Sequence, residues 1–95
     1  MATVEQRLFN MCAKMRKRAE DTRKLIATKN RRRIELAERR NAAAEADPVN
    51  HALVAELTRA LDQLEEELDS DRASLSEQED DLRFNCGSVH PLPPN

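Results

Sequence analysis

The first half of the chain carries apolar and small residues at helical spacing. From Thr3 to about Ala46 it contains neither glycine nor proline, so no helix-breaking residue interrupts this stretch. Six of these residues follow one another at alternating spacings of four and three, which places them on one face of a helix. These six residues are Leu8, Cys12, Met15, Ala19, Thr22 and Ile26. The same phase continues through Lys29, Arg33, Leu36 and Arg40, so this stripe becomes basic towards the middle of the chain.

The second half has a stricter pattern, with apolar branched residues every seven positions and leucines at intermediate positions. This heptad pattern is typical of a coiled-coil seam. The seam residues, which we expect to bind a partner helix, are Val54, Leu57, Leu61, Leu64, Leu68, Leu75 and Leu82. Asp71 and Gln78 take the remaining intermediate positions. Polar seam residues weaken packing but fix the register against one partner.

Asp47-Pro48 separates the two patterns. Proline pushes the residue before it out of the helical conformation but fits the first turn of a new helix. Asp47 is therefore predicted to be the N-cap of the second helix. The other interpretation is one long helix kinked at Pro48, and the sequence does not separate the two.

The patterns predict an all-α fold, a two-helix antiparallel coiled-coil hairpin broken at Asp47-Pro48. A basic amphipathic helix is expected over residues 1–46 and an acidic leucine-heptad helix over 47–86. The second helix should end near Asn85, with Gly87 as its left-handed cap. Residues 87–95 are expected to form an irregular, Pro-rich C-terminal tail.

Composition and charge agree with paired helices. Charged residues make up 36% of the 95 residues and aromatic residues 2%, as in long helices and coiled coils. Residues 1–46 have a net charge of +7 and residues 47–95 a net charge of −9. Such asymmetry indicates either a basic arm for an anionic partner or two elements that pair with each other.

A chain that folds back at residues 46–48 brings together residues whose numbers sum to about 95. In this register Asp71 lies opposite Arg23 and Lys24. Lys29 and Arg33 lie near Glu66 and Asp62, and Phe9 meets Phe84 at the open end. The polar seam positions then face opposite charges. The same complementarity could operate between two chains.

A cluster of five arginines is the candidate nucleic-acid contact: Arg31, Arg32, Arg33, Arg39 and Arg40. Clustered positive charge suffices for phosphate binding, but no Tyr or Trp is interleaved to stack on bases. ERRNAAAEA, residues 38–46, resembles the asparagine-plus-alanine motif of basic leucine zippers. The family's basic residue eight positions after the asparagine is Val49 here, and Asp47-Pro48 interrupts the helix that this family keeps continuous. We therefore favour a solvated or acid-paired basic face.

The sequence offers no chemical site. Gly87 is the only glycine, so no glycine-rich loop exists to bind a nucleotide, and no cofactor is expected. Cys12 and Cys86 lie close in the hairpin register, where they are either free thiols or a disulfide. With His90 they provide three ligands and no zinc motif, so no metal site is predicted. The carboxylates lie on solvated helix faces, which argues against catalysis.

We expect a non-catalytic structural subunit or adaptor that docks onto a larger protein assembly, or self-associates, through its leucine seam. Exposed apolar flanks that include Leu25, Leu36 and Leu53 also suggest a partner. The alternative is an RNA- or DNA-associated protein that uses the basic helix. No signal peptide or membrane span is apparent, so an intracellular, cytoplasmic location is expected by default. The basic amphipathic start leaves a mitochondrial location open.

Overall fold

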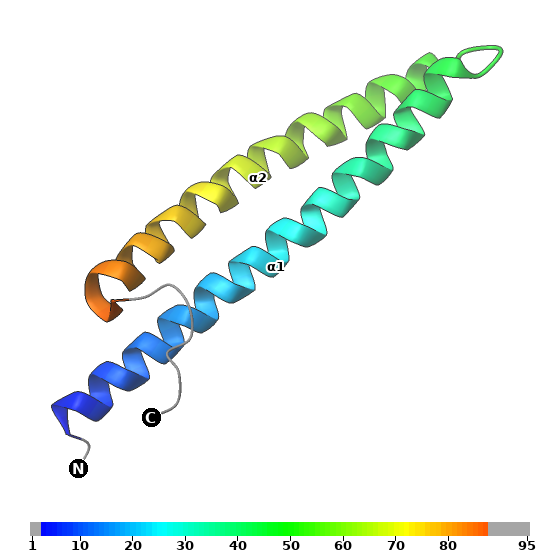
Figure 1. The fold of residues 1–95 in the computed structure, drawn as a ribbon. Helices are drawn as coiled ribbons and strands as arrows, with labels where there is room; N and C mark the ends of the chain where they lie inside the picture. The colour runs from blue at the N-terminus through cyan, green and yellow to red at the C-terminus, as the bar shows by residue number, and fades with distance from the viewer. Residues whose placement is uncertain (1–2, 88–95) are drawn as a thin grey trace.

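The computed structural model describes residues 3–87 and contains two long helices (Figure 1). Helix α1 comprises Val4–Glu45 and helix α2 comprises His51–Cys86. Within residues 3–87 there is no strand, which confirms the all-α prediction. The predicted Pro-rich tail lies outside the described residues, apart from Gly87.

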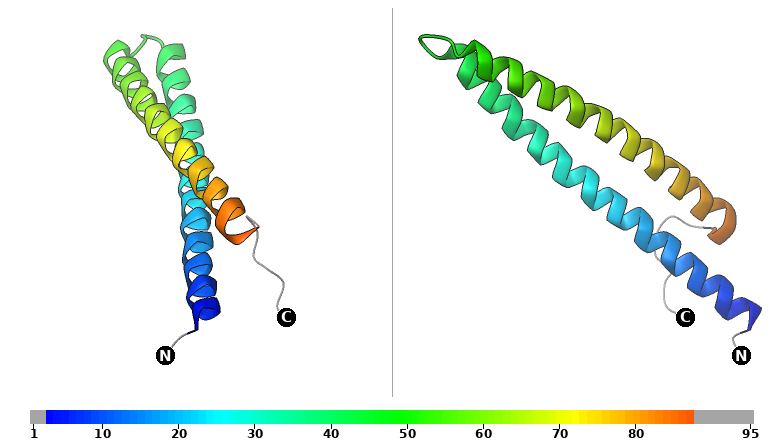
Figure 2. Two further views of the ribbon diagram at one scale, coloured as in Figure 1. Left: turned by 90° about the vertical axis from the view of Figure 1, so that its left-hand side faces the viewer. Right: turned by 180° about the vertical axis from the view of Figure 1, so that it is seen from behind.

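The two helices pack side by side in opposite directions, as the three views in Figures 1 and 2 show. The Cα atoms span 69 × 21 × 21 Å. The chain therefore folds back between α1 and α2 and does not continue as one kinked helix.

Helix α1 starts with a reciprocal cap. The Thr3 hydroxyl accepts a hydrogen bond from the Gln6 amide, and the Gln6 side chain accepts one from the Thr3 amide, both at 3.1 Å. These bonds satisfy two of the amide groups that a helix start leaves unpaired. The 42 residues that follow contain no helix breaker.

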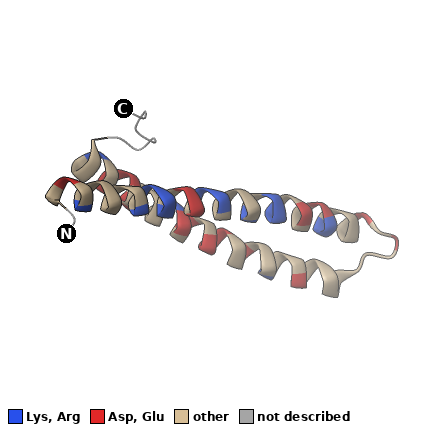
Figure 3. Cartoon of the chain, turned by 90° about the horizontal axis from the view of Figure 1, so that it is seen from below, with Lys and Arg blue, Asp and Glu red and all other residues tan. Residues whose placement is uncertain are grey.

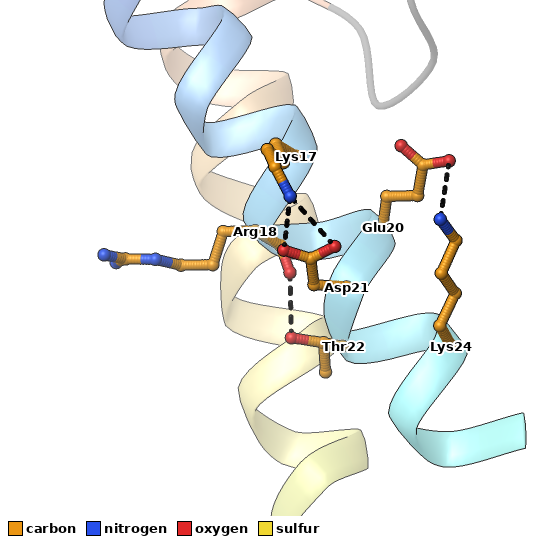
Figure 4. Close-up of polar contacts among 6 residues, drawn as sticks. All are labelled: Lys17, Arg18, Glu20, Asp21, Thr22 and Lys24. Carbon is orange, nitrogen blue, oxygen red and sulfur yellow. Dashed lines mark hydrogen bonds and ion pairs between the residues drawn. The ribbon is translucent and has the colours of Figure 1, made fainter. Parts of the chain in front are cut away.

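Polar contacts within α1 support its outer face (Figure 4). Lys17 pairs with Asp21 at 3.0 Å and Lys24 with Glu20 at 3.8 Å, each one helical turn apart. Exposed pairs of this kind stabilise a helix by about 0.3–0.5 kcal/mol each. The Thr22 hydroxyl donates to the Arg18 carbonyl at 3.0 Å, so this polar seam residue finds its partner within its own helix.

The connection between the helices corrects the predicted cap. Asn50, not Asp47, caps α2: its side-chain oxygen accepts a hydrogen bond from the Leu53 amide at 3.1 Å. The Asn50 amide in turn donates to the Ala43 carbonyl at 3.2 Å and so ties the start of α2 to the end of α1. Antiparallel helix axes lie about 8–10 Å apart. A cap at Asp47 would leave Ala46 alone to bridge that distance, so the chain uses residues 46–50.

The other end of α2 confirms the prediction. The helix ends at Cys86, and Gly87 adopts a left-handed conformation with φ 74°. Its amide donates to the Arg83 carbonyl at 3.2 Å, which closes the last turn. A side chain would disfavour this backbone conformation, although the space around Gly87 is open.

The core is a single row of side chains between the helices. Its largest cluster combines Leu36 of α1 with four leucines of α2. The buried residues are Cys12, Ala19, Leu36, Ala43, Leu57, Leu61, Leu64, Leu68 and Leu82. All of these follow the stripes expected from the sequence or, for Ala43, extend one by seven positions. The expectation that Leu36 is an exposed flank is therefore wrong, because Leu36 lies in the stripe itself.

Candidate interaction site at the open end of the hairpin

The predicted partner-binding leucines are covered by helix α1. Within α2, Leu57, Leu61, Leu64, Leu68 and Leu82 are buried, whereas Val54 and Leu75 are half-buried. Leu36 and the partly buried Ile26 and Ala37 pack on this row from α1. A partner could reach the seam leucines only by displacing α1.

Lys29 and Asp71 form the closest ion pair between the helices. The Lys29 ammonium lies 2.8 Å from an Asp71 carboxylate oxygen, and the two side chains are only 21% and 19% exposed. The hydrogen bond to Asp71, followed by the charges of Asp71 and Glu67, raises the pKa of Lys29 above its ordinary value of 10.5 against an opposing effect of burial. Opposite charges therefore do meet at the polar seam positions.

The predicted partners of these seam residues are nevertheless wrong, and the partner of Asp71 lies five to six residues further along α1 than expected. Asp71 pairs with Lys29 instead of Arg23 or Lys24, and Arg23 lies 3.7 Å from Glu79. The interhelical polar pairs and the disulfide join residues whose numbers sum to 98–102 instead of about 95. Part of the shift comes from the five-residue connection. The rest arises because helical side chains lean towards their own N-terminus, which in antiparallel helices raises the sum for side chains that touch.

The five candidate arginines do not gather on one surface. Arg31, Arg32 and Arg39 are exposed, whereas Arg33 and Arg40 are half-buried beside the seam. Arg32 lies 3.4 Å from Glu35 of the same helix. Figure 3 shows basic residues spread along α1 and acidic residues alongside them on α2.

Arg33 and Arg40 line a groove of about 270 Å³ that they share with two acidic residues of α2, Asp62 and Glu65. Arg33 was predicted to lie near Asp62, and the groove brings these two residues together. Among the described residues, however, no carboxylate lies within 4.0 Å of the Arg33 guanidinium.

The open end of the hairpin has a different character. Cys12 and Cys86 form a disulfide, with their Cα atoms 5.9 Å apart, and this bond links α1 to the last residue of α2. Residues 4–11, which we call the overhang, precede Cys12, and α1 extends past the end of α2 there (Figures 1 and 2). The overhang carries four exposed apolar side chains, between 44% and 80% accessible: Val4, Leu8, Phe9 and Met11.

A cavity of about 250 Å³ lies where the overhang meets the end of α2. Leu8, Phe9 and the disulfide form its apolar part, and polar side chains complete its wall. These polar residues are Glu5, Arg16 and Asn85. A half-open, largely apolar hollow on a helix end is a feature that a partner side chain can fill.

The predicted contact between the two phenylalanines is wrong. Phe84 is 92% exposed, which leaves almost none of its ring for a packed contact with Phe9. Phe84 follows the fully buried Leu82 by two residues, and two helical steps rotate a side chain by about 200°. It therefore points away from α1.

The disulfide resolves one alternative that the sequence left open. The sulfur atoms of Cys12 and Cys86 are bonded to each other, so in this state they are not thiolate ligands. His90, the third candidate ligand, lies outside the described residues. Within the described part of the chain, no group of three His, Cys, Asp or Glu residues is arranged to hold a metal ion.

Sequence reasoning missed the overhang because it expected Phe9 to pack against Phe84 at the open end. Two signals mark it in retrospect. Gly87 ends α2 early, and the apolar stripe of α1 starts before Cys12, at Leu8.

Comparison of the chain with protein-family models, with curated proteins and with solved structures finds no match. Neither α1 nor α2 contains an apolar stretch that is long enough to cross a membrane.

Proposed function

We propose that this chain is a non-catalytic structural protein, an antiparallel coiled-coil hairpin that docks onto other protein chains of a larger assembly. The observation that carries the proposal is the apolar overhang, which leaves four large side chains exposed on two consecutive turns of α1. Contiguous exposed apolar side chains on a small protein commonly mark an interaction site.

Heptad spacing in both helices supports the coiled-coil part of the proposal. In α1, Cys12 and Ala19 are seven apart, as are Leu36 and Ala43, and all four are buried. In α2 the buried leucines belong to the two seam positions that the sequence pattern defines. The ion pair between Lys29 and Asp71 matches the use of polar seam residues to fix register.

The docking surface we propose differs from the leucine seam expected from the sequence. The seam leucines are buried against α1, so using them for docking would require the hairpin to open. The overhang needs no such rearrangement. It sits at the end of a rod closed by the disulfide, where its four apolar side chains are between 44% and 80% exposed.

Photocrosslinking tests this function. A photoreactive phenylalanine analogue at position 9 should crosslink to protein in cells of the source organism, because Phe9 is 62% exposed on the overhang. The same analogue at Phe84 is the matched control, since that ring is exposed but points away from α1. Equal protein crosslinking at both positions, or none at position 9, would contradict docking through the overhang.

Binding to a nucleic-acid backbone is the second candidate. It is favoured by the exposed Arg31 and Arg39, for which no carboxylate lies within 4.0 Å among the described residues. The acidic side chains beside Arg33 and Arg40 oppose it. A salt titration with nonspecific RNA separates the two functions, because phosphate contacts give a steep slope of log affinity against log salt. Binding that survives in 0.5 M salt, or that is absent at low salt, would exclude the phosphate mode.

A further inference from the structure

We propose that the partner of the overhang is a second copy of this chain, docked end to end so that the two overhangs pack antiparallel about a two-fold axis. This inference rests on the docking role proposed above and names its partner. The result is a rod of two hairpins joined at their ends by a short two-helix overlap, in which the two overhangs lie side by side.

The first support is the continuity of the overhang with the interface inside the hairpin. Leu8 lies seven residues before Met15, and Met15 is half-buried between the helices. Cys12, four residues after Leu8, is buried against α2. The stripe that binds α2 therefore continues into the overhang, where α2 has ended. Its side chains are exposed because α2 ends before it reaches them, although they lie on the same face of α1 as the residues that contact α2.

The second support is a match of lengths. Helix α1 has 42 residues and α2 has 36, so within residues 3–87 about two turns of α1 have no helix alongside them. The overhang of a second copy has the same eight residues, about 12 Å of helix. Laid antiparallel to the first overhang, it occupies the space in line with α2. Each copy then supplies the stretch of helix that the other lacks.

The third support is electrostatic. In this arrangement the start of the second copy's α1 follows the end of α2, and both helices run in the same direction. The end of a helix carries a partial negative charge and the start a partial positive charge. Their approach is favourable, as in successive turns of one continuous helix. A parallel arrangement of the two overhangs would bring two positive helix starts together.

Two-fold symmetry also makes the overhang self-complementary. Leu8 lies near the middle of residues 4–11, so it meets its own counterpart close to the axis. Val4 and Met11, at opposite ends of the same stripe, lie near each other across the axis. One association event thus covers the apolar side chains of both copies. The interface falls at the small end of specific interfaces, so the dimer should be weak and depend on concentration.

Shape and mass together test the arrangement. We expect sedimentation equilibrium of the full oxidised chain to show a monomer and dimer in exchange. Scattering should give a dimer about 125 Å long, twice the 69 Å of the hairpin less the overlap. A chain that stays monomeric up to millimolar concentration, or a dimer no longer than about 75 Å and therefore side by side, would overturn the proposal.

Two matched variants locate the interface. Phe9→Glu should raise the dimer dissociation constant at least about tenfold, because a charge replaces an apolar ring in both copies. Phe84→Glu changes the same residue type on the opposite face and should alter the constant less than about threefold. Both phenylalanine side chains are exposed, so both variants should keep the helix content of the parent chain as measured by circular dichroism. Equal effects of the two variants would overturn the proposal.

A photoreactive residue at position 8 separates this inference from the function on which it rests. Crosslinks between the overhangs of two copies support the end-to-end dimer. Crosslinks in cells to a different protein alone would sink the dimer and leave the docking function standing. Intramolecular crosslinks to residues 88–95 alone would overturn both, because the chain would then cover its own overhang.

Discussion

The two halves of the hairpin, on either side of the Lys29–Asp71 pair, are held together differently. The half next to the connection contains Leu36, Leu57, Leu61 and Leu64 in one apolar cluster, which Leu68 completes near the middle of the rod. The open half has three buried residues, Cys12, Ala19 and Leu82, outside that cluster. Half-buried residues with polar side chains fill much of the remaining space there.

Buried polar atoms without partners also distinguish the open half from the half next to the connection. A nitrogen of Arg16 and the side-chain oxygen of Gln78 are buried without a hydrogen-bond partner in the structure described, and both belong to the open half. Buried polar atoms without partners cost about 1–3 kcal/mol each. The half next to the connection contains the larger apolar cluster, so we expect the open half to depend more on the Cys12–Cys86 bond. A disulfide is one of the ways in which proteins with a small hydrophobic core gain stability.

Reduction of the disulfide should have the largest effect. The bond closes a loop between residues 74 apart, so its removal should lower the free energy of unfolding by about 2–5 kcal/mol. Chemical denaturation of the oxidised and reduced chains measures this change. Amide hydrogen exchange should then show residues 75–86 opening more readily than residues 57–64. Protection that remains even along α2 after reduction would remove the distinction between the halves.

Leu68→Ala should be nearly as damaging. Leu68 is fully buried in the leucine cluster, and truncation to alanine should cost about 2–4 kcal/mol through lost burial and the cavity left behind. Leu75→Ala, seven residues later and half-buried in the open half, is the matched control and should cost less than half as much. Urea denaturation of both variants measures the difference. Equal losses would mean that the leucine cluster is not the main source of stability.

These two leucines show what the sequence could and could not provide. Heptad spacing identified both as seam residues, because periodicity depends only on local helical geometry. It did not reveal that one is fully buried and the other half-buried, since burial depends on the residues that face them across the interface.

The error in the predicted pairing of residues between α1 and α2 also arises from features that local sequence does not determine. That the chain forms two helices, and which side of each helix faces the other, follow from local sequence, and both were predicted. The axial offset depends on the length of the connection, where Asn50 and not Asp47 caps α2, and on the lean of side chains. That offset decides which charges meet and places the overhang beyond the end of α2. Predicted pairs such as that between Asp71 and Lys24 therefore failed, although the two helices were predicted correctly.

Charge exchange at the boundary between the halves should have an intermediate effect. Lys29→Asp and Asp71→Lys each place like charges within the seam and should destabilise the hairpin, though less than Leu68→Ala. The double variant restores opposite charges and should recover part of the loss. A double-mutant cycle of unfolding free energies measures the coupling. Additive losses would show that the pair, despite its 2.8 Å separation, does not contribute to the register.

Asn50→Ala should have a smaller effect, about 1 kcal/mol, because it removes the side chain that caps α2. The comparison with Asp47→Ala is informative, since that residue was the cap expected from the sequence. Asp47→Ala should change the free energy of unfolding by less than about 0.5 kcal/mol. Thermal or urea denaturation of the two variants measures this. A larger loss of unfolding free energy for Asp47→Ala than for Asn50→Ala would indicate that Asp47 caps α2, as the sequence predicted.

The smallest expected effect is the pH dependence of the Lys29–Asp71 pair. The pKa of Lys29 is raised above 10.5 in the folded chain, chiefly by its hydrogen bond to Asp71. The folded state therefore holds this proton more tightly than the unfolded state. The resulting stabilisation is fully present below pH 10.5 and is lost as the pH rises through the folded-state pKa.

Lys29→Met has no such proton, so the stability difference between parent and variant should shrink between about pH 9 and about pH 12. Unfolding free energies of both chains across that range measure the change. A difference that stays constant, or that grows with pH, would mean that Asp71 does not hold the Lys29 proton and that the boundary between the two halves is fixed by packing alone.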